Sequence, residues 1–260
     1  MGNSQLQKIR NTPARHSTLT KSMRRVQETS GVSADRDVLA FDGPIGIVGG
    51  GVADAALLGE LARRGVALVG ADGGADAIAA AGLTPAAIIG DLDSLHDRHS
   101  WDGRTRIVHI AEQLTTDFQK ALYSTWAPVT LVLGMTGGRL DHTLGALSAV
   151  LEYAPSRHLL LVDEVDVALA ATGKIRFEAV QGERVSVHPL VPIAFDRSAG
   201  LLYPLHGLTL EPGGRLGTSN AATGGTVEIV PGSTDPWLLI LPRERLWDLV
   251  AAVTPKEKGR

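Results

Sequence analysis

The sequence predicts an N-terminal, mostly parallel α/β sandwich domain followed by a C-terminal all-β sandwich or barrel domain. Between residues 43 and 172, short apolar segments alternate with helix-like segments, the pattern of a parallel sheet covered on both faces. From residue 173 to residue 260, the apolar segments are short, rich in β-branched residues and separated by Gly and Pro. Residues 1–42 show neither pattern and are expected to form a flexible leader.

The leader is basic, rich in Ser and Thr, and without an acidic residue before Glu28. This composition is typical of a disordered tail. An organellar transit peptide is also Arg- and Ser-rich, so import into an organelle is the less favoured alternative.

Composition and charge exclude several classes of protein. The chain has 260 residues and no cysteine, which rules out disulfides, thiolate metal sites and cysteine nucleophiles. Its net charge of −3 gives no general affinity for polyanions, so no nucleic-acid partner is expected. No apolar run approaches the roughly 20 residues that cross a bilayer. We therefore expect a soluble, cytoplasmic protein without a membrane partner.

The α/β part contains alternating strands and helices. Strands are predicted at residues 45–48, 66–70, 86–90, 106–110, 129–134 and 158–162, and helices at residues 53–65, 75–82, 115–126 and 139–153. In the first helix, Asp54 fits the N-cap position, and Gly65 fits the C-terminal end of the helix. In the C-terminal part, strands are predicted within residues 174–180, 183–190, 207–212, 224–232 and 237–243.

Ligands of open parallel sheets bind beyond the carboxyl ends of the strands, so residues that directly follow a strand are site candidates. In chain order these candidates are Gly49, Gly50, Gly51, Asp72, Asp91, Asp93, Asp117, Arg139 and Asp141. The glycine run lets backbone N–H groups approach a phosphate. A tight turn without a ligand has the same sequence, and both interpretations stay open.

The two aspartates of "GDLDS", Asp91 and Asp93, are the strongest signal. Residues i and i+2 of an extended segment point the same way, so these carboxylates repel each other unless a cation lies between them. Mg²⁺ with oxygen ligands suits such a pair. A solvated acidic turn is the alternative.

The sequence does not determine which groups the nearby basic side chains contact. Arg139 can bind phosphate through two N–H groups, or form an ion pair with Asp141 or Asp93. Lys120 faces either the site or solvent. His142 lies in the first turn of a predicted helix, where packing or capping is the commoner role, and it is not assigned to catalysis.

Together, glycine turns, aspartates and one arginine indicate Mg-nucleotide chemistry. The Walker A pattern and the kinase HRD and DFG motifs are absent. The nucleotide is therefore expected to be held by a different scheme.

The motifs "ADGGAD", "IIGDLDS", "TDFQKAL" and "GGRLDHTLGAL", in this order, resemble thiamin pyrophosphokinase, also called thiamine diphosphokinase. The resemblance continues through "GLLYPLHGLTL", "GTSN" and "VEIVPG" and covers roughly residues 45–241. It implies an enzyme that transfers a pyrophosphoryl group from ATP to thiamin, giving thiamin diphosphate and AMP. It also implies Mg²⁺ as cofactor, ATP as co-substrate, and a homodimer with shared active sites.

The resemblance assigns roles to individual residues. Catalytic roles fall to Asp72, Asp91, Asp93, Asp117, Arg139 and Asp141, and the metal to Asp72, Asp91 and Asp93. ATP binding falls to Gly49, Gly50, Asp72, Gly73, Gly74, Thr116, Gly137, Gly138 and Arg139. Thiamin binding falls to Asp93, Asp141, Ser219 and Asn220, with the last two contributed across the dimer. An aromatic such as Tyr203 or Trp237 stacks on the thiamin ring or belongs to the β-domain core.

Three positions depart from the family pattern. The family often has Asn where this chain has Asp76, Phe where it has Leu92, and Glu where it has Ala221. The last change leaves open a diphosphokinase for a different small alcohol, such as a pterin or a thiamin analogue. A non-catalytic nucleotide or thiamin sensor with the same fold is the third hypothesis.

Overall fold

The computed structural model describes residues 10–12 and 38–254, and the chain divides into two compact units, Met1–Ala149 and Val150–Arg260. The division falls within helix α5 (Leu140–Tyr153). The sequence pattern instead predicts a boundary near residue 172, where helix-like segments end. Strand pairing explains the difference, because β10 (Asp166–Ala171) pairs in antiparallel fashion with β17 (Trp237–Pro242). Residues just before 172 therefore belong to the sheet of the C-terminal strands.

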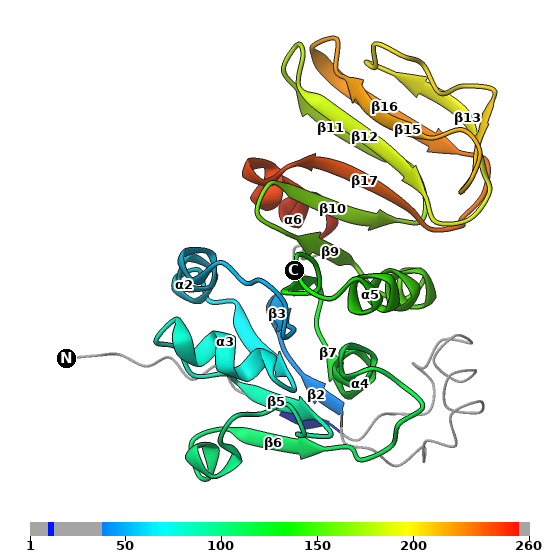
Figure 1. Cartoon of the computed structure of the whole chain (residues 1–260). Coiled ribbons are helices and arrows are strands. Elements are labelled where there is room, and N and C mark those ends of the chain that lie inside the picture. Colours follow the sequence, from blue (N-terminus) through cyan, green and yellow to red (C-terminus); the bar gives the residue numbers. More distant parts are fainter. Residues whose placement is uncertain (1–9, 13–37, 255–260) are drawn as a thin grey trace. The chain divides into compact units, whose positions relative to one another are not determined.

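The first unit contains a five-stranded parallel sheet in the order β8-β3-β4-β5-β6. Its strands are β3 (Ile45–Val48), β4 (Ala67–Ala71), β5 (Ala87–Gly90), β6 (Arg106–His109) and β8 (Thr130–Leu133). Figure 1 labels β3, β5 and β6 of this sheet. Every residue of β3, β5 and β8 is buried, as expected for strands covered on both faces. The connecting segments include α2 (Ala55–Arg63), α3 (Gly74–Ala80), the 3₁₀ helix η1 (Arg98–Trp101) and α4 (Asp117–Ser124).

The strand order of this sheet reverses between β3 and β8. From β3 the chain steps outward through β4, β5 and β6, and then returns to the other side of β3 as β8. Such a reversal opens a crevice at the carboxyl ends of the two strands, where ligands bind in open α/β sheets. The glycine-rich loops 49–51 and 134–138 lie at this point.

A small second sheet corrects two sequence-based expectations. Strand β2 (Val38–Ala40) pairs with β1 (Arg10–Thr12) and, in parallel, with β7 (Thr125–Trp126). Leu39 and Phe41 are buried, so the end of the predicted leader, residues 1–42, is part of the fold. The expectation of flexibility otherwise concerns residues 1–9 and 13–37, which lie outside the described residues. Helix α4 ends at Ser124, earlier than predicted, because Thr125 and Trp126 join this sheet.

The second unit consists of two antiparallel sheets. One has the order β15-β12-β17-β10-β9, with β9 (Leu159–Val162), β12 (Arg184–Pro189) and β15 (Gly217–Ala221). The other has the order β11-β16-β13-β14, with β11 (Ile175–Ala179), β13 (Ile193–Ala199), β14 (Leu208–Leu210) and β16 (Gly225–Pro231). The Phe195 and Trp237 rings, one from each sheet, meet edge-on with centroids 5.5 Å apart. The two sheets thus pack face to face as a sandwich.

Several elements of this unit were not predicted from the sequence: β10, β13, β15, the 3₁₀ helix η2 (Arg243–Arg245) and α6 (Leu246–Val253).

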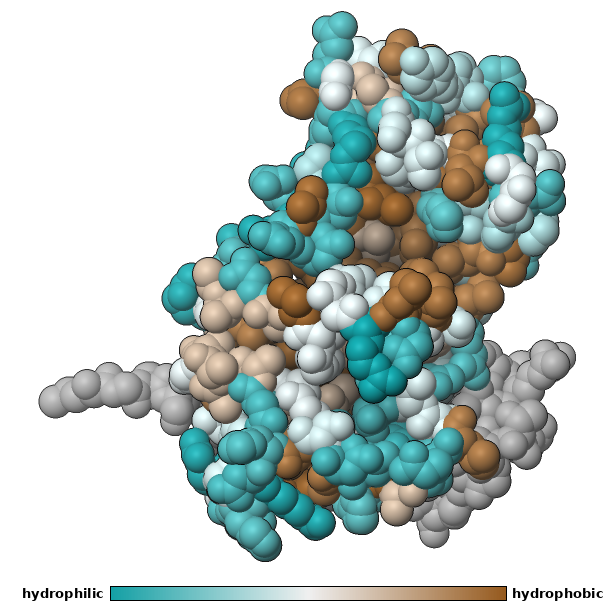
Figure 2. Space-filling model, viewed as in Figure 1, coloured by the Kyte–Doolittle hydropathy of each residue, from teal (hydrophilic) through white to brown (hydrophobic). Residues whose placement is uncertain are grey.

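The visible surface mixes hydrophilic and hydrophobic residues (Figure 2). Among the described residues, no helix has the length and apolar character needed to cross a membrane.

Candidate active site

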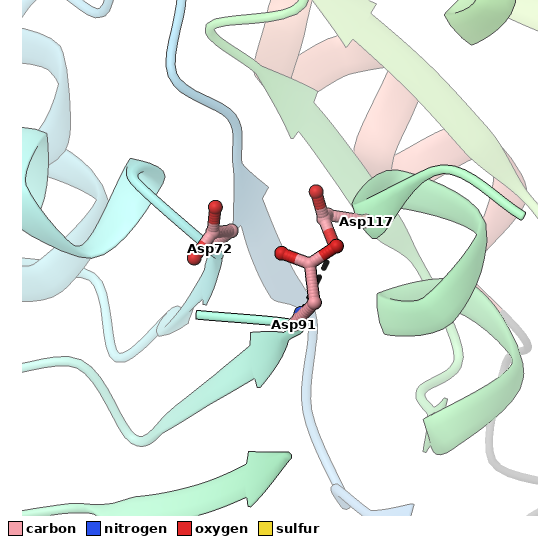
Figure 3. A group of neighbouring side chains, drawn as sticks. All are labelled: Asp72, Asp91 and Asp117. Atoms are coloured by element: carbon pink, nitrogen blue, oxygen red, sulfur yellow. Dashed lines mark hydrogen bonds between the residues drawn. The ribbon is translucent and has the colours of Figure 1, made fainter. Parts of the chain in front are cut away.

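Three loops of the first unit bring together Asp72, Asp91 and Asp117 (Figure 3). Asp72 follows β4, Asp91 follows β5, and Asp117 is the first residue of α4. One carboxylate oxygen from each lies within 4.8 Å of the others. The carboxyl edge of the sheet therefore gathers acids that are far apart in the sequence, as the strand-end argument predicts.

Two glycines permit close packing at this edge of the sheet, one beside the acids and one at the start of α3. A Cβ on Gly90 would lie 2.9 Å from Asp72 Cβ and 3.0 Å from Asp117 Oδ1, so a side chain there would displace both acids. A Cβ on Gly74 would lie 1.8 Å from the Val48 carbonyl oxygen, so only glycine lets α3 start this close to β3.

Helix α4 places Asp117 through a capping box. The Thr116 hydroxyl accepts a hydrogen bond from Gln119 N at 3.3 Å, and Gln119 Oε1 accepts one from Thr116 N at 3.0 Å. These bonds satisfy N–H groups that a helix start leaves without partners. Thr116, a predicted ATP-binding residue, thus orients the first turn of α4.

Asp72 is the most buried member of the acidic cluster, with 3% of its surface exposed. Its Oδ2 accepts a hydrogen bond from Ser94 N at 3.0 Å, whereas its buried Oδ1 has no hydrogen-bond partner among the described residues. Burial raises the pKa of Asp72, and the charges of Asp117 and Asp91 raise it further, against the bonds from Ser94. A bound cation would reverse this penalty.

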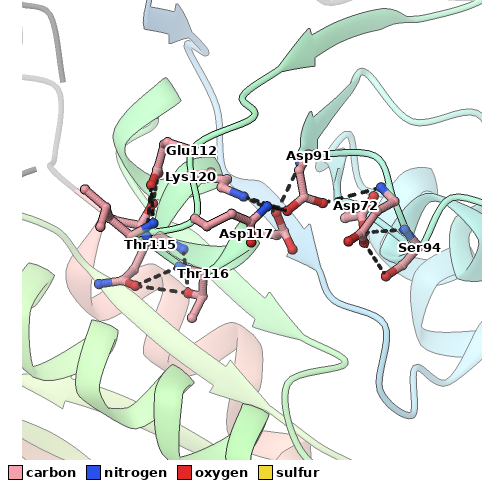
Figure 4. A network of polar contacts seen from close by, with 12 residues as sticks. Asp72, Asp91, Ser94, Glu112, Thr115, Thr116, Asp117 and Lys120 are labelled. Atoms are coloured by element: carbon pink, nitrogen blue, oxygen red, sulfur yellow. Dashed lines mark hydrogen bonds and ion pairs between the residues drawn. The ribbon is translucent and has the colours of Figure 1, made fainter. Parts of the chain in front are cut away.

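Lys120 balances part of the acidic charge (Figure 4). Its Nζ donates to Asp91 Oδ2 at 3.1 Å and to Asp117 Oδ1 at 3.0 Å, and its side chain is 1% exposed. Burial opposes the charged form, but the hydrogen bonds to Asp117 and Asp91 outweigh it and raise the pKa of Lys120. The choice that the sequence left open is thereby settled, because Lys120 faces the acids and not solvent.

Asp91 receives further support from the loop before α4. Gln113 Nε2 donates to Asp91 Oδ2 at 2.8 Å, and Asp91 N donates to Asp117 Oδ1 at 3.3 Å. Burial disfavours the ionised Asp91, but the bonds from Gln113 and Lys120 prevail and lower its pKa. Asp91 is therefore ionised at neutral pH.

The donor set of the acidic cluster fits Mg²⁺. Three carboxylates offer the hard oxygen ligands that Mg²⁺ prefers, at Mg–O distances of about 2.1 Å. The buried, unpaired Oδ1 of Asp72 is a ligand atom without another partner in the described structure. With Lys120 included, the formal charge of the cluster is −2, the amount that one divalent cation neutralises.

Asp93 does not belong to the cluster, although the sequence placed it beside Asp91. The backbone turns at Leu92, whose φ is 67°, so the segment is not extended, and the Asp93 carboxylate is not among the three that cluster. Leu92 packs with Leu95 and Trp101 in the core, which explains an apolar residue between two acids. Asp93 is exposed and accepts a hydrogen bond from Ser94 Oγ at 3.0 Å.

Arg139 and Asp141 form a separate pair at the start of α5. Arg139 Nη2 lies 2.6 Å from Asp141 Oδ2, and Nε lies 3.1 Å from Oδ1. Both side chains are mostly exposed, at 71% and 63%. The ion pair that the sequence left as an alternative for Arg139 is thus present, and His142 beside it is exposed.

The glycine loops at the switch point pack tightly against each other. Gly49 N donates to Leu133 O and Gly51 N to Gly134 O, each at 2.8 Å. A Cβ on Gly51 would lie 2.6 Å from Gly134 O, so glycine is needed there for packing. Gly50 is exposed, and a Cβ there would meet no described atom within 4 Å. Of the three glycines, Gly50 is the one with an open face toward a ligand.

In the second unit, Asn220 has a structural task. Its buried side chain accepts from Tyr203 N at 3.0 Å and donates to Tyr203 O at 2.7 Å, which fixes the backbone of that residue. Ser219 is exposed and adopts a φ of 57°, unusual for a side-chain-bearing residue. Trp237 is fully buried, while Tyr203 is 64% exposed. The geometry therefore favours Tyr203 over Trp237 as the aromatic open to a ligand.

Sequence reasoning missed the supporting polar residues. Glu112 accepts bonds from Leu114 N at 2.6 Å, Thr115 N at 3.1 Å and Tyr123 Oη at 3.0 Å, and so shapes the loop that carries Gln113 (Figure 4). Burial opposes ionisation of Glu112, but these bonds and one from Thr115 Oγ1 lower its pKa. An acid three residues before a threonine-rich helix start was the available signal.

Comparisons with known proteins agree with the motif resemblance. The sequence model of the family described as thiamin pyrophosphokinase, catalytic domain, matches residues 58–161. Thiamine pyrophosphokinase 1 of Oryza sativa subsp. japonica is 29% identical over 175 residues, which cover 60% of this chain and 66% of that protein. Thiamin pyrophosphokinase 1 of Caenorhabditis elegans is 29% identical over 154 residues, covering 54% of this chain and 63% of that protein. The match spans slightly less than two thirds of either relative.

Solved structures share the fold. A thiamin pyrophosphokinase from Geobacillus thermodenitrificans is 26% identical, with a TM-score of 0.63 over 76% of this chain and 97% of that one. A thiamine pyrophosphokinase from Bacillus subtilis is 22% identical, with a TM-score of 0.64 over 76% and 98%. The predicted resemblance is confirmed, and so is the predicted fold class of an α/β part with a β-rich C-terminal part.

Proposed function

We propose that this chain, whose residues 58–161 match the catalytic domain of thiamin pyrophosphokinases, transfers a pyrophosphoryl group from ATP to thiamin. The products are thiamin diphosphate and AMP, and the reaction depends on Mg²⁺. The observation that carries the proposal is the meeting of Asp72, Asp91 and Asp117 at the carboxyl edge of the sheet. The sequence contains no Walker A loop and no kinase HRD or DFG motif that would indicate a phosphate site elsewhere.

The residues that would hold Mg²⁺ are Asp72, Asp91 and Asp117, with Asp117 in place of the Asp93 first assigned. When bound, Mg²⁺ supplies positive charge to the triphosphate as a Lewis acid. The fit rests on the donor set and on the unpaired Oδ1 of buried Asp72.

The rest of the ATP site is proposed around the switch point. Gly50 presents an open backbone to a phosphate, and Gly137 and Gly138 lie on the facing loop. Arg139 is exposed enough to exchange its bond with Asp141 for a phosphate oxygen, where a guanidinium makes paired hydrogen bonds. Gly73, Gly74 and Thr116 act through the backbone of the turns that hold the acids.

In the reaction, the thiamin hydroxyl oxygen forms a bond to the β-phosphorus of ATP, and the bond between that phosphorus and the bridging oxygen of AMP breaks. The hydroxyl proton passes to a carboxylate. Asp93 is our proposed acceptor, because it is exposed, whereas Asp72 is buried among the proposed metal ligands. The protein contributes mainly position and charge, as in other phosphoryl transfers.

The thiamin side is proposed to include Asp93, Asp141 and Ser219, with Asn220 holding Tyr203 for stacking on the cationic ring. The residues of the second unit are proposed to serve the site of a partner copy in a homodimer. Light scattering at micromolar concentration is expected to give the mass of two chains. A fully active monomer would contradict the shared site. A cytoplasmic location remains part of this proposal.

A product assay tests the function. The purified chain with ATP, Mg²⁺ and thiamin should form AMP and thiamin diphosphate in equal amounts, and a chelator should abolish both. Asp91→Asn is the matched inactive control, since it keeps the side-chain shape and removes the charge. ADP as product, or turnover only with another alcohol in a substrate panel, would show that the assignment is wrong. Binding without turnover would favour the sensor hypothesis.

A further inference from the structure

The acidic cluster contains a buried cation for which the proposed reaction has no direct use. The Lys120 side chain is 1% exposed, and its Nζ is held between Asp91 Oδ2 and Asp117 Oδ1 at 3.1 and 3.0 Å. An ammonium committed to two carboxylates and closed off from solvent does not reach a substrate. Lys120 therefore acts, if at all, through the acids that it touches.

The position of Lys120 divides the carboxylate oxygens into two groups. Asp91 Oδ2 and Asp117 Oδ1 face the ammonium, and Gln113 Nε2 and Asp91 N add their bonds to these same two atoms. The other oxygen of Asp117 and the unpaired Oδ1 of Asp72 lie outside these bonds. Lys120 thus engages one oxygen of each partner, while the second oxygen of Asp91 accepts from Asp93 N at 3.4 Å and the second oxygen of Asp117 takes part in none of these bonds.

Charge decides what the cluster can accept. Three carboxylates, one buried and two partly buried, each bring an oxygen within 4.8 Å of the others and therefore repel one another. One ammonium reduces their formal charge from −3 to −2. A single divalent cation then completes the balance, whereas a second one would leave an excess of positive charge.

We propose that Lys120 is a positioning residue that serves as an internal counter-ion: it holds Asp91 and Asp117 together before metal arrives and leaves the cluster ready for one divalent cation. This inference rests on the proposed function, because it concerns the same metal site. Lys120 occupies the place between two acids that a second ion would take in a two-metal site, where ions lie about 3.5–4 Å apart.

The test is the thermal stability of the full chain with and without Mg²⁺, in the absence of nucleotide. In chelator, Lys120→Met is expected to lower the unfolding midpoint by on the order of 10 °C, because it leaves two partly buried acids beside buried Asp72 without a counter-ion. Saturating Mg²⁺ should remove at least half of this deficit. The matched control is Lys174→Met, whose Nζ lies 2.9 Å from Glu228 at a 54% exposed position. Its midpoint difference from wild type should not respond to Mg²⁺.

A deficit of Lys120→Met that is equal with and without Mg²⁺ would show that the lysine merely packs, and would overturn the inference. If this variant does not fold, Lys120→Met/Asp117→Asn restores the cluster charge of −2 and is expected to fold. Failure of the double variant to recover would also overturn it. Titration of metal-free wild type with Mn²⁺, followed by electron paramagnetic resonance, should count one ion per chain, and two would contradict the inference.

The two proposals fail in different ways. A wild type that forms AMP and gains stability from Mg²⁺, with an unchanged deficit in Lys120→Met, contradicts only the role of Lys120. A wild type with neither AMP formation nor a response to Mg²⁺ contradicts the proposed function, and the role of Lys120 with it.

Discussion

At the scale of single residues, the acidic cluster contains an aspartate, Asp72, in an energetically unfavourable environment. Asp72 combines burial, an unpaired oxygen and a φ of 47°, each unfavourable for an ionised aspartate by itself. Burial and the neighbouring charges of Asp117 and Asp91 raise its pKa. Residues whose environment is unfavourable, and that make no evident contribution to stability, often belong to functional sites.

Replacing Asp72 by Asn separates function from stability. We expect Asp72→Asn to lower turnover on the order of a hundredfold or more, because the proposed metal site loses a ligand. Stability in chelator should not fall, since the change removes a buried charge that faces two other acids. Activity assays and thermal unfolding with and without Mg²⁺ measure the two effects.

Asp76→Asn is the matched control, because it makes the same chemical change four residues later, in the first turn of α3. Asp76 Oδ2 accepts from His96 N at 3.0 Å, and an amide oxygen can do the same. This variant should keep wild-type activity. Full activity in Asp72→Asn would mean that Asp72 binds no metal.

The sequence identified all three clustered acids, because strand ends in a parallel sheet share one edge. It could not show that the Asp93 carboxylate lies outside the acidic cluster, since the positive φ of Leu92 accompanies the packing of that side chain with Trp101. It also could not orient Lys120, whose direction is set by Asp91 on a different loop. Residue types were readable, whereas their directions depend on tertiary packing.

At the scale of elements, the switch-point loop tests which glycines serve packing and which serve a ligand. Gly51→Ala is expected to lower the free energy of unfolding by about 1–3 kcal/mol, because its methyl group would press on Gly134 O. Gly50→Ala should leave stability unchanged but raise KM for ATP by roughly tenfold, as a lost phosphate contact would. Chemical denaturation and steady-state kinetics distinguish the two variants. An unchanged KM in Gly50→Ala would exclude Gly50 from the ATP site.

Elements with strong local signals were predicted well. Helix α2 begins after Asp54, whose Oδ1 accepts from Ala56 N at 2.9 Å, as the capping pattern indicates. The end of α4 was missed, because β7 exists only through pairing with β2, more than 80 residues earlier in the chain. Short β10, rich in alanine, was missed for the same reason, since its strand character comes from β9 and β17.

At the scale of the whole molecule, the sequence pattern and the strand pairing place the boundary between the two units at different residues. The alternation of strand-like and helix-like segments ends near residue 172. The pairing of β10 with β9 and β17 joins residues 159–171 to the C-terminal unit. Every residue of β9 is buried, as are five of the six residues of β10.

Two fragments decide between these limits. Residues 150–260 should be more soluble and unfold more cooperatively than residues 173–260, because in the longer fragment β17 keeps β10 on one side and β12 on the other. Residues 173–260 should aggregate, because they leave the apolar strand "WLLILP" with an open edge. Size-exclusion chromatography and near-ultraviolet circular dichroism measure both outcomes. Both fragments contain Trp237 and Trp247, and the Trp237 ring is fully buried against Phe195 only in a packed sandwich. If the shorter fragment were equally soluble and cooperative, β9 and β10 would be dispensable for the C-terminal unit, and the boundary near residue 172 would be the correct one.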